Sequence, residues 1–202
     1  MEFHGFAAPV SKSSGPLHPP GASRIPSFGT VRHRTLAKAV NRDWLVVGWS
    51  ENLESYRRAF VWDYHSGQMK ELGTLGGSSS EAFDISDARR IVGQADRSDG
   101  THRAVVFESG GPRDLGTLGG AASSAHGVNE RGQVVGWSWT QEGRVHAFLW
   151  QEGRLIDLND SIAPDSGWVL QYAEAINDRG QITGWGRKDG ETRAFVLDEI
   201  RR

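Results

Sequence analysis

The sequence predicts an all-β fold in which one four-stranded unit is repeated four times, as in a β-propeller. Three observations support this prediction. The chain of 202 residues contains 26 Gly and 8 Trp, a composition that favours short strands and tight turns. A Gly at the end of a mostly apolar run recurs about every 45 residues, at Gly48, Gly93, Gly136 and Gly184. An Ala preceded by a basic residue follows each of these, at Ala59, Ala104, Ala147 and Ala194.

The third unit illustrates the first half of the expected order. A strand of small residues around Ala125 comes first, because a crowded central axis favours small side chains. A hairpin turn follows at residues 129–132, where Asn129 can cap the turn and Gly132 can adopt the left-handed conformation. The second strand is expected through residues 134–137.

The second half of the unit contains the two outer strands. The third strand is expected at residues 147–150, after a polar loop that contains Gly143. A turn at Gly153 leads into the fourth strand, residues 154–158. In the earlier units, the fourth strand continues into a repeated Leu-Gly-Thr-Leu-Gly-Gly segment, which is expected to cross over to the next unit.

The repeat defines the expected domain organisation. Residues 1–23, rich in Ser, Pro, Gly and Ala, predict a flexible arm, and residues 24–202 predict one propeller domain. Its units are about residues 29–72, 73–115, 116–158 and 159–202. Residues 24–28 match a fourth strand, so we expect them to complete the last blade and close the ring. The alternative is an open section of a longer array.

Composition and charge exclude several classes of function. Lys and Arg number 23 against 25 Asp and Glu, so the net charge of -2 gives no general attraction to nucleic acid or to an anionic membrane. The absence of Cys excludes disulfides, thiolate metal sites and Cys nucleophiles. No segment predicts a membrane span, and residues 1–20 contain no apolar run typical of a signal peptide.

Several motifs together resemble the HAF repeat family of extracellular repeat proteins. They are Leu-Gly-Thr-Leu-Gly-Gly, Asn-Asp-Arg-Gly-Gln-Ile at residues 177–182, the Gly-Trp pairs, and His-Ala-Phe-Leu-Trp at residues 146–150. The match covers about residues 24–202. The resemblance implies a propeller-like β fold and an extracellular or cell-surface location, and it brings no catalytic residues. The His of the motif is present at His146, and Arg replaces it in the other units.

The basic residue before each repeated Ala is the first candidate binding group. Circular repetition would place these residues at equivalent points around a ring, where four cations could bind an anion or an acidic partner. The alternative is that each one pairs with a carboxylate on a neighbouring strand. The four residues are Arg58, Arg103, His146 and Arg193.

Three of the Trp residues fall outside the repeat pattern and are candidate contacts for a partner. Trp139 stands where the other units have polar residues, Trp44 replaces a turn Gly, and Trp168 lies in a segment found in the last unit alone. Exposed aromatic side chains of this kind bind protein partners or stack on sugar rings. Trp44 and Trp139 are expected on opposite faces, and local packing is the alternative for each.

These observations predict a non-catalytic binding or assembly module with a protein partner. We expect no catalytic residues, metal or cofactor, because no metal-ligand spacing, phosphate loop or nucleophile motif is visible. A carbohydrate-binding, lectin-like module is the alternative, and a small propeller hydrolase comes third. The number of chains in the assembly is open, a homodimer included.

Overall fold

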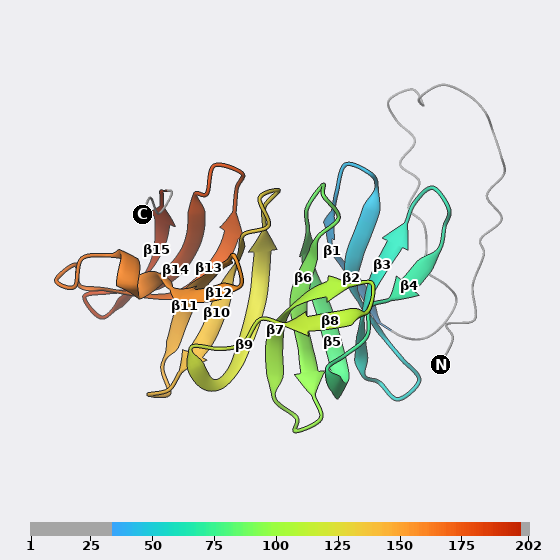
Figure 1. The fold of residues 1–202 in the computed structure, drawn as a ribbon, viewed down its shortest axis with the longest axis horizontal. Helices are drawn as coiled ribbons and strands as arrows, with labels where there is room; N and C mark the ends of the chain where they lie inside the picture. Colours follow the sequence, from blue (N-terminus) through green and yellow to red (C-terminus); the bar gives the residue numbers. More distant parts are fainter. Residues whose placement is uncertain (1–33, 199–202) are drawn as a thin grey trace.

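The computed structural model describes residues 34–198, and in this range the predicted all-β fold is confirmed. Fifteen strands form four antiparallel sheets that follow one another along the chain (Figure 1). Each of the first three sheets has four strands, and the last has three. Within every sheet the strands are ordered as in the sequence, so each strand is joined to its neighbour by a short connection.

The first sheet contains β1 (Thr35–Val40), β2 (Leu45–Glu51), β3 (Arg57–Asp63) and β4 (Met69–Glu71). The second contains β5 (Gly76–Ile85), β6 (Ile91–Arg97), β7 (His102–Glu108) and β8 (Gly111–Asp114). The third contains β9 (Gly119–Val128), β10 (Val134–Thr140), β11 (Val145–Gln151) and β12 (Arg154–Asp157). A 3-10 turn, η1 (Leu158–Ser161), leads to the last sheet, β13 (Trp168–Ile176), β14 (Ile182–Lys188) and β15 (Glu191–Leu197).

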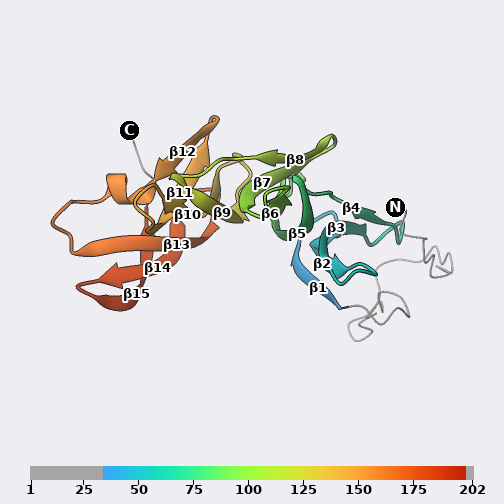
Figure 2. The ribbon, with the colours of Figure 1, turned by 90° about the horizontal axis from the view of Figure 1, so that it is seen from below.

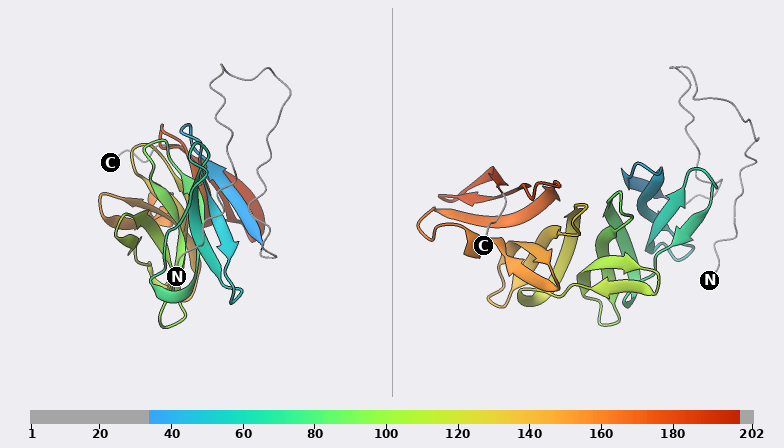
Figure 3. Two further views of the ribbon diagram at one scale, coloured as in Figure 1. Left: turned by 90° about the vertical axis from the view of Figure 1, so that its right-hand side faces the viewer. Right: turned by 45° about the horizontal axis from the view of Figure 1, so that its top comes forward.

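The four sheets form a curved row. Seen from below, β8 and β12 lie on the outer side of the curve, whereas the first strands of the sheets lie toward its inner side (Figure 2). The first and last sheets stand at opposite ends of the row in Figure 1 and in the right-hand view of Figure 3, so the described residues form an open array. The expected closing strand, residues 24–28, lies outside the described residues.

The turn between the first two strands of each sheet explains one repeated Gly. The chain reverses over four residues, and the backbone N–H of Gly132 donates to the Asn129 carbonyl at 3.0 Å. The fourth residue of this turn has a positive φ, which Gly adopts at the lowest cost. Trp44 at φ 59° and Arg89 at φ 62° take the same conformation in the first two sheets.

The repeated Gly in the second strand is required by close backbone contact. A Cβ on Gly136 would lie 2.0 Å from the Ser124 carbonyl oxygen of the adjacent first strand. The other three repeated glycines, Gly48, Gly93 and Gly184, meet the same kind of contact at 1.9–2.0 Å. In each sheet this Gly lies beside a break in the register between the first two strands, so an added side chain would force the strands apart.

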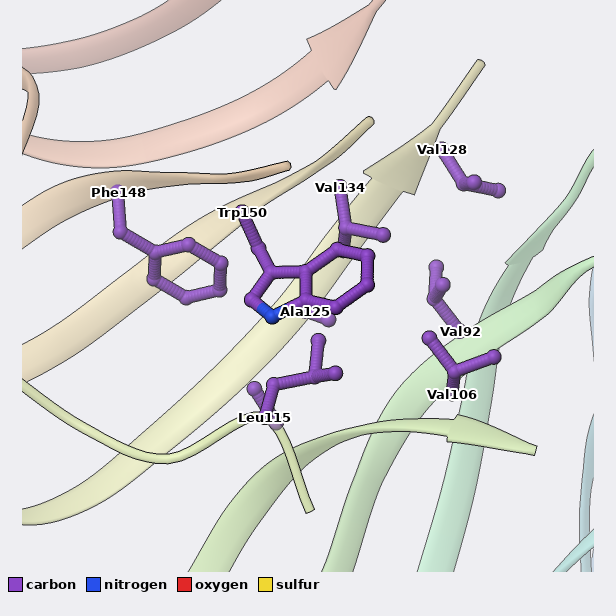
Figure 4. Close-up of a cluster of buried hydrophobic side chains, with 9 residues drawn as sticks. Val92, Val106, Leu115, Ala125, Val128, Val134, Phe148 and Trp150 are labelled. Atoms are coloured by element: carbon purple, nitrogen blue, oxygen red, sulfur yellow. The ribbon is translucent and has the colours of Figure 1, made fainter. Parts of the chain in front are cut away.

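The hydrophobic core lies between the sheets. Three clusters of buried side chains fill the three junctions between neighbouring sheets. In the middle junction, Val92 and Val106 of the second sheet pack with Val134, Phe148 and Trp150 of the third (Figure 4). Each sheet is therefore stabilised by its neighbours, as in repeat proteins whose single units cannot bury their own apolar faces.

Hydrogen bonds between sheets accompany this packing. The hydroxyl of Ser80 in β5 accepts from the backbone N–H of Ala59 at 3.0 Å, and Ser123 in β9 accepts in the same way from Ala104 at 2.9 Å. Both hydroxyls are buried, so each satisfies a backbone donor that the short outer strand leaves unpaired. The repeated Ala thus marks a point where one sheet is fixed to the next.

Candidate functional site

The four predicted cations lie at equivalent positions on the third strand of each sheet, and the structure pairs each with a carboxylate. Arg58 Nε lies 3.6 Å from Glu71, and Arg103 Nε lies 3.9 Å from Asp114. His146 Nδ1 lies 2.5 Å from Asp157. In all three sheets the carboxylate belongs to the outermost strand.

Arg193 differs from the other three cations. Its sheet has no fourth strand among the described residues, and its guanidinium contacts Glu191 on the same strand. Both of these side chains are well exposed. Each of these basic residues therefore has a carboxylate as its local partner, which favours the structural alternative over a shared anion site.

Trp168 is the most enclosed of the three unusual tryptophans. It is half-buried and packs against the core between the third and last sheets. Its ring meets Phe195 edge-on, with 6.4 Å between centroids. This placement gives Trp168 a packing role, because a contact of this geometry stabilises the apolar surface that it covers.

Trp139 and Trp44 are both exposed and lie far apart in the fold. Trp139, 40% exposed, stands near the end of β10, opposite Val145 of β11. Trp44 lies in the turn between β1 and β2, two sheets away. The two residues belong to opposite ends of their strands, so no single site contains both.

Trp44 is part of a small aromatic patch. Its ring lies 5.3 Å from that of Tyr64, at an interplanar angle of 37°. Tyr64 in turn meets His65 and Trp62 edge-on, each with 5.7 Å between centroids. A backbone hydrogen bond from the Tyr64 N–H to the Trp44 carbonyl, at 3.2 Å, fixes the two segments together. We call Trp44 and Tyr64 the aromatic patch.

The turns beside the aromatic patch form a ladder across the array. The backbone N–H of Arg42 donates to the Asp87 carboxylate at 2.7 Å, and the Arg42 guanidinium pairs with the same group. The N–H of Asp87 donates to Glu130, and the N–H of Glu130 donates to Asp178 at 2.9 Å. One acidic residue per turn thus reaches back to the backbone of the preceding turn, and neighbouring turns are joined from the first sheet to the last.

A second connection runs along the inner strands, and its residues were not among the candidates predicted from the sequence. Lys38 Nζ lies 5.9 Å from the Phe83 ring centroid, and Phe83 meets His126 edge-on at 5.2 Å. His126 Nδ1 lies 2.9 Å from Glu174, which also accepts from Trp185 Nε1 at 3.1 Å. An ionised carboxylate can only accept, so the Nδ1–H of His126 donates.

This inner row has a recognisable sequence signal. Its members directly follow the small Ala of the first strand in each unit, at a position that holds a Lys, a Phe, a His and a Glu. A position that differs between units that are otherwise similar holds residues that the architecture does not require. The same reasoning singled out the three unusual Trp residues. The row connects adjacent first strands, and its end groups, Lys38 and Glu174, are exposed.

An aromatic strip lies beside the inner row. Trp137 meets His102 of the second sheet edge-on at 5.6 Å and Tyr172 of the last sheet at 5.7 Å. Tyr172 stacks on Trp185 with 4.1 Å between centroids. Burial lowers the pKa of His102, although the charge of Asp96 partly offsets this. His102 is therefore neutral at neutral pH and acts as a packing ring.

The described residues provide no grouped metal ligands. Among residues 34–198, no three His, Asp or Glu side chains come close enough together to hold a metal ion. In the same range, no helix has the length and apolar character needed to cross a bilayer.

Comparison with known proteins assigns no family. No protein-family model matches the sequence, and no curated protein is significantly similar to it. The resemblance to the HAF repeat family, and the extracellular location that it implies, stay predictions.

Proposed function

We propose that the four sheets are blades of a propeller-type array that works as a non-catalytic binding or assembly module. In this proposal a protein partner binds the aromatic patch, Trp44 and Tyr64. The cations that could have formed an anion site are occupied by carboxylates, and Trp168 is used in packing. The aromatic patch is thus the strongest of the candidate surfaces, ahead of the single exposed ring of Trp139.

The exposure of Trp44 is the observation that carries this proposal. Its side chain is 56% exposed although it is one of the largest apolar groups in the chain. The turn itself does not require an aromatic residue, because Arg89, Gly132 and Gly180 occupy the same position in the other sheets. Two aromatic side chains that already pack on each other lose little conformational entropy on binding. Trp and Tyr are enriched among the residues that dominate protein interfaces for this reason.

The test compares the wild-type chain with a variant that lacks the patch. Each immobilised protein is exposed to the source extract, captured proteins are identified, and binding of the purified partner is measured by titration calorimetry. Trp44→Ala combined with Tyr64→Ala is expected to weaken that binding by roughly 30-fold or more, as for an interface hot spot. Leu53→Ala is the matched control, since Leu53 is an exposed apolar residue on a different hairpin of the same sheet.

Two outcomes would overturn the proposal. One is equal capture by the wild-type and patch variants, which would place binding elsewhere. The other is release of captured material by free sugar with binding still dependent on Trp44, which would favour the carbohydrate-binding alternative.

A further inference from the structure

The face of the last sheet that points away from the third sheet exposes several side chains. In the preceding sheets, the side chains at the same repeat positions are buried in the core or pack against it. Val196 is 72% exposed, whereas Leu149, at the same repeat position in the third sheet, is 3% exposed. Thr183 and Ala194 are exposed too, whereas their counterparts Val135 and Ala147 are fully buried against the last sheet. We call Thr183, Ala194 and Val196 the tail face.

The first sheet exposes the complementary kind of face. Ala37 and Val40 of β1 are exposed. Their counterparts in the third sheet, Ala125 and Val128, are buried in the core that receives the second sheet. We call Ala37 and Val40 the head face. At every internal junction, the face of one sheet that corresponds to the tail face packs on the face of the next sheet that corresponds to the head face. The two exposed ends of the array are therefore complementary.

The turns at the two ends also match. At the first internal junction Arg89, the fourth residue of its turn, reaches back to Asp43, the third residue of the preceding turn, at 2.8 Å. At the tail end the third residue is Arg179, and at the head end the fourth residue is Trp44. An internal type of junction between these ends would place the Arg179 guanidinium against the Trp44 ring, a favourable cation–π pair.

The amide of Asn177 supplies a second match. Asn129 Nδ2 donates both to Gln133 and, at 3.0 Å, to the carbonyl of Asn177 in the following turn. Asn177 Nδ2 makes the first of these bonds, to Gln181 at 2.8 Å. Its remaining N–H is positioned as in Asn129, and Asn41 occupies the accepting position in the first turn.

We propose that the tail face of one copy of this chain binds the head face of a second copy, head to tail. This rests on the proposed function, because it identifies the protein partner of the surface around Trp44. The new junction would repeat three features of the internal junctions. These are the packing of the two apolar faces, the hydrogen bond from the Asn177 amide to the Asn41 carbonyl, and the contact between Arg179 and Trp44. The contact is heterologous, so it produces a closed ring or a longer series of copies, as the rotation per copy dictates.

The first test is the mass of the full chain by sedimentation velocity, up to about 100 µM. The expected result is a species of at least twice the chain mass. Val196→Glu and Val40→Glu should each weaken association by roughly 100-fold, because each buries an unpaired charge in the junction. Both side chains are exposed in the single chain, so the circular dichroism spectrum should not change. Leu53→Glu, at an 82% exposed position outside both faces, is the control and should still associate.

The same variants distinguish head-to-tail binding from the other ways in which the tail face could be covered. A Val40→Glu variant that associates like the wild type would show tail-to-tail pairing and overturn the proposal. A monomeric wild type whose thermal stability falls with Val196→Glu would show that residues of the same chain cover the tail face, which also overturns it.

A charge-swap experiment tests the register of the junction. Arg179→Asp should weaken association by about tenfold, because it removes the cation that faces the Trp44 ring. Adding Trp44→Arg should restore association, since Arg and Asp then reproduce the Arg89 and Asp43 pair, and Arg89 already adopts the same positive φ. Failure of the double variant to recover would overturn this register.

The outcomes also separate this proposal from the proposed function. A monomeric wild type that still binds a different protein through Trp44 would overturn the head-to-tail contact and leave the proposed function standing. A monomeric wild type without any Trp44-dependent partner would overturn both.

Discussion

The same repeat positions occur in two different surroundings. One set lies in the junction between the third and last sheets, and the other lies on the exposed tail face. Ala147 and Leu149 are buried in the junction because the last sheet packs on them. Ala194 and Val196 occupy those positions in the last sheet and are exposed. The side chains are nearly the same, so their burial depends on the neighbouring sheet.

This comparison shows where the stability of the array arises. The free energy of burying apolar surface is gained only where two sheets meet, so an internal face contributes and an end face does not. Substitutions at equivalent positions should therefore have very different effects. All stability measurements below are made in the Val40→Glu background, so that association between copies does not contribute.

The largest difference is expected from a buried charge. Ala147→Glu places a carboxylate in the sealed junction without a partner and should lower the free energy of unfolding by roughly 4 kcal/mol or more. Ala194→Glu adds the same group to the exposed tail face and should change it by less than about 0.5 kcal/mol. Urea unfolding followed by circular dichroism measures both. Similar losses in the two variants would contradict the comparison.

A smaller difference is expected from truncation to Ala. Leu149→Ala leaves a cavity between two sheets and should cost about 2–4 kcal/mol. Val196→Ala removes exposed atoms and should cost less than about 0.5 kcal/mol. Thermal unfolding monitored by calorimetry distinguishes the two. A loss above about 1.5 kcal/mol for Val196→Ala would mean that the tail face is already covered within one chain.

The turn ladder should contribute less than the apolar junctions. Glu130 accepts from the backbone N–H groups of Asp87 and Ala88, so Glu130→Ala should cost about 1 kcal/mol. Arg179→Ala, in the corresponding turn at the tail end, is the control and should be close to neutral. Unfolding in urea provides both values, and a neutral Glu130→Ala would exclude the ladder as a source of stability.

The smallest effect is a pH dependence at the first junction. Hydrogen bonds from Arg42 and its positive charge hold the pKa of Asp87 below its usual range. Because the folded-state pKa lies below the unfolded-state value, this pair stabilises the fold above the unfolded-state pKa. That stabilisation is lost as the pH falls through the folded-state pKa.

An NMR titration of the Asp87 carboxyl carbon tests the effect directly. Arg42→Ala should raise the titration midpoint part of the way toward the usual value for Asp, because the variant removes the guanidinium hydrogen bond and charge but keeps the backbone N–H donor of residue 42. Asp99 is the internal control, because hydrogen bonds from Thr101 in the second sheet hold its pKa below the usual range and Arg42 does not contribute. An unchanged Asp87 midpoint would show that Arg42 does not set this pKa.

Most of the local structure followed from the sequence. The first strand of the third sheet contains Ala125 and ends at Val128, directly before the turn that the sequence predicted at residues 129–132. The turn glycines Gly132 and Gly180 have positive φ, because the four-residue reversal needs that conformation. Such features depend on a few adjacent residues, so the sequence pattern is enough to locate them.

The candidate site was less predictable. The sequence indicated that Arg58, Arg103 and His146 are equivalent, but their pairing with the outermost strand depends on strand register. The inner row from Lys38 to Glu174 joins residues more than one hundred positions apart, through contacts that only the stacking of sheets creates. Trp44 and Trp168 were both singled out by the sequence, and packing leaves Trp44 exposed but half-buries Trp168 against the core.

The sequence by itself determined the class of fold, the repeat and its turns, because these depend on side-chain size, alternation and local backbone conformation. The tertiary structure alone decided which copies of each repeated residue are buried. Val196 and Leu149 occupy one repeat position, and a neighbouring sheet covers only Leu149 among the described residues. The physical reason is that apolar burial belongs to a pair of surfaces, whereas a repeat sequence specifies only one of them.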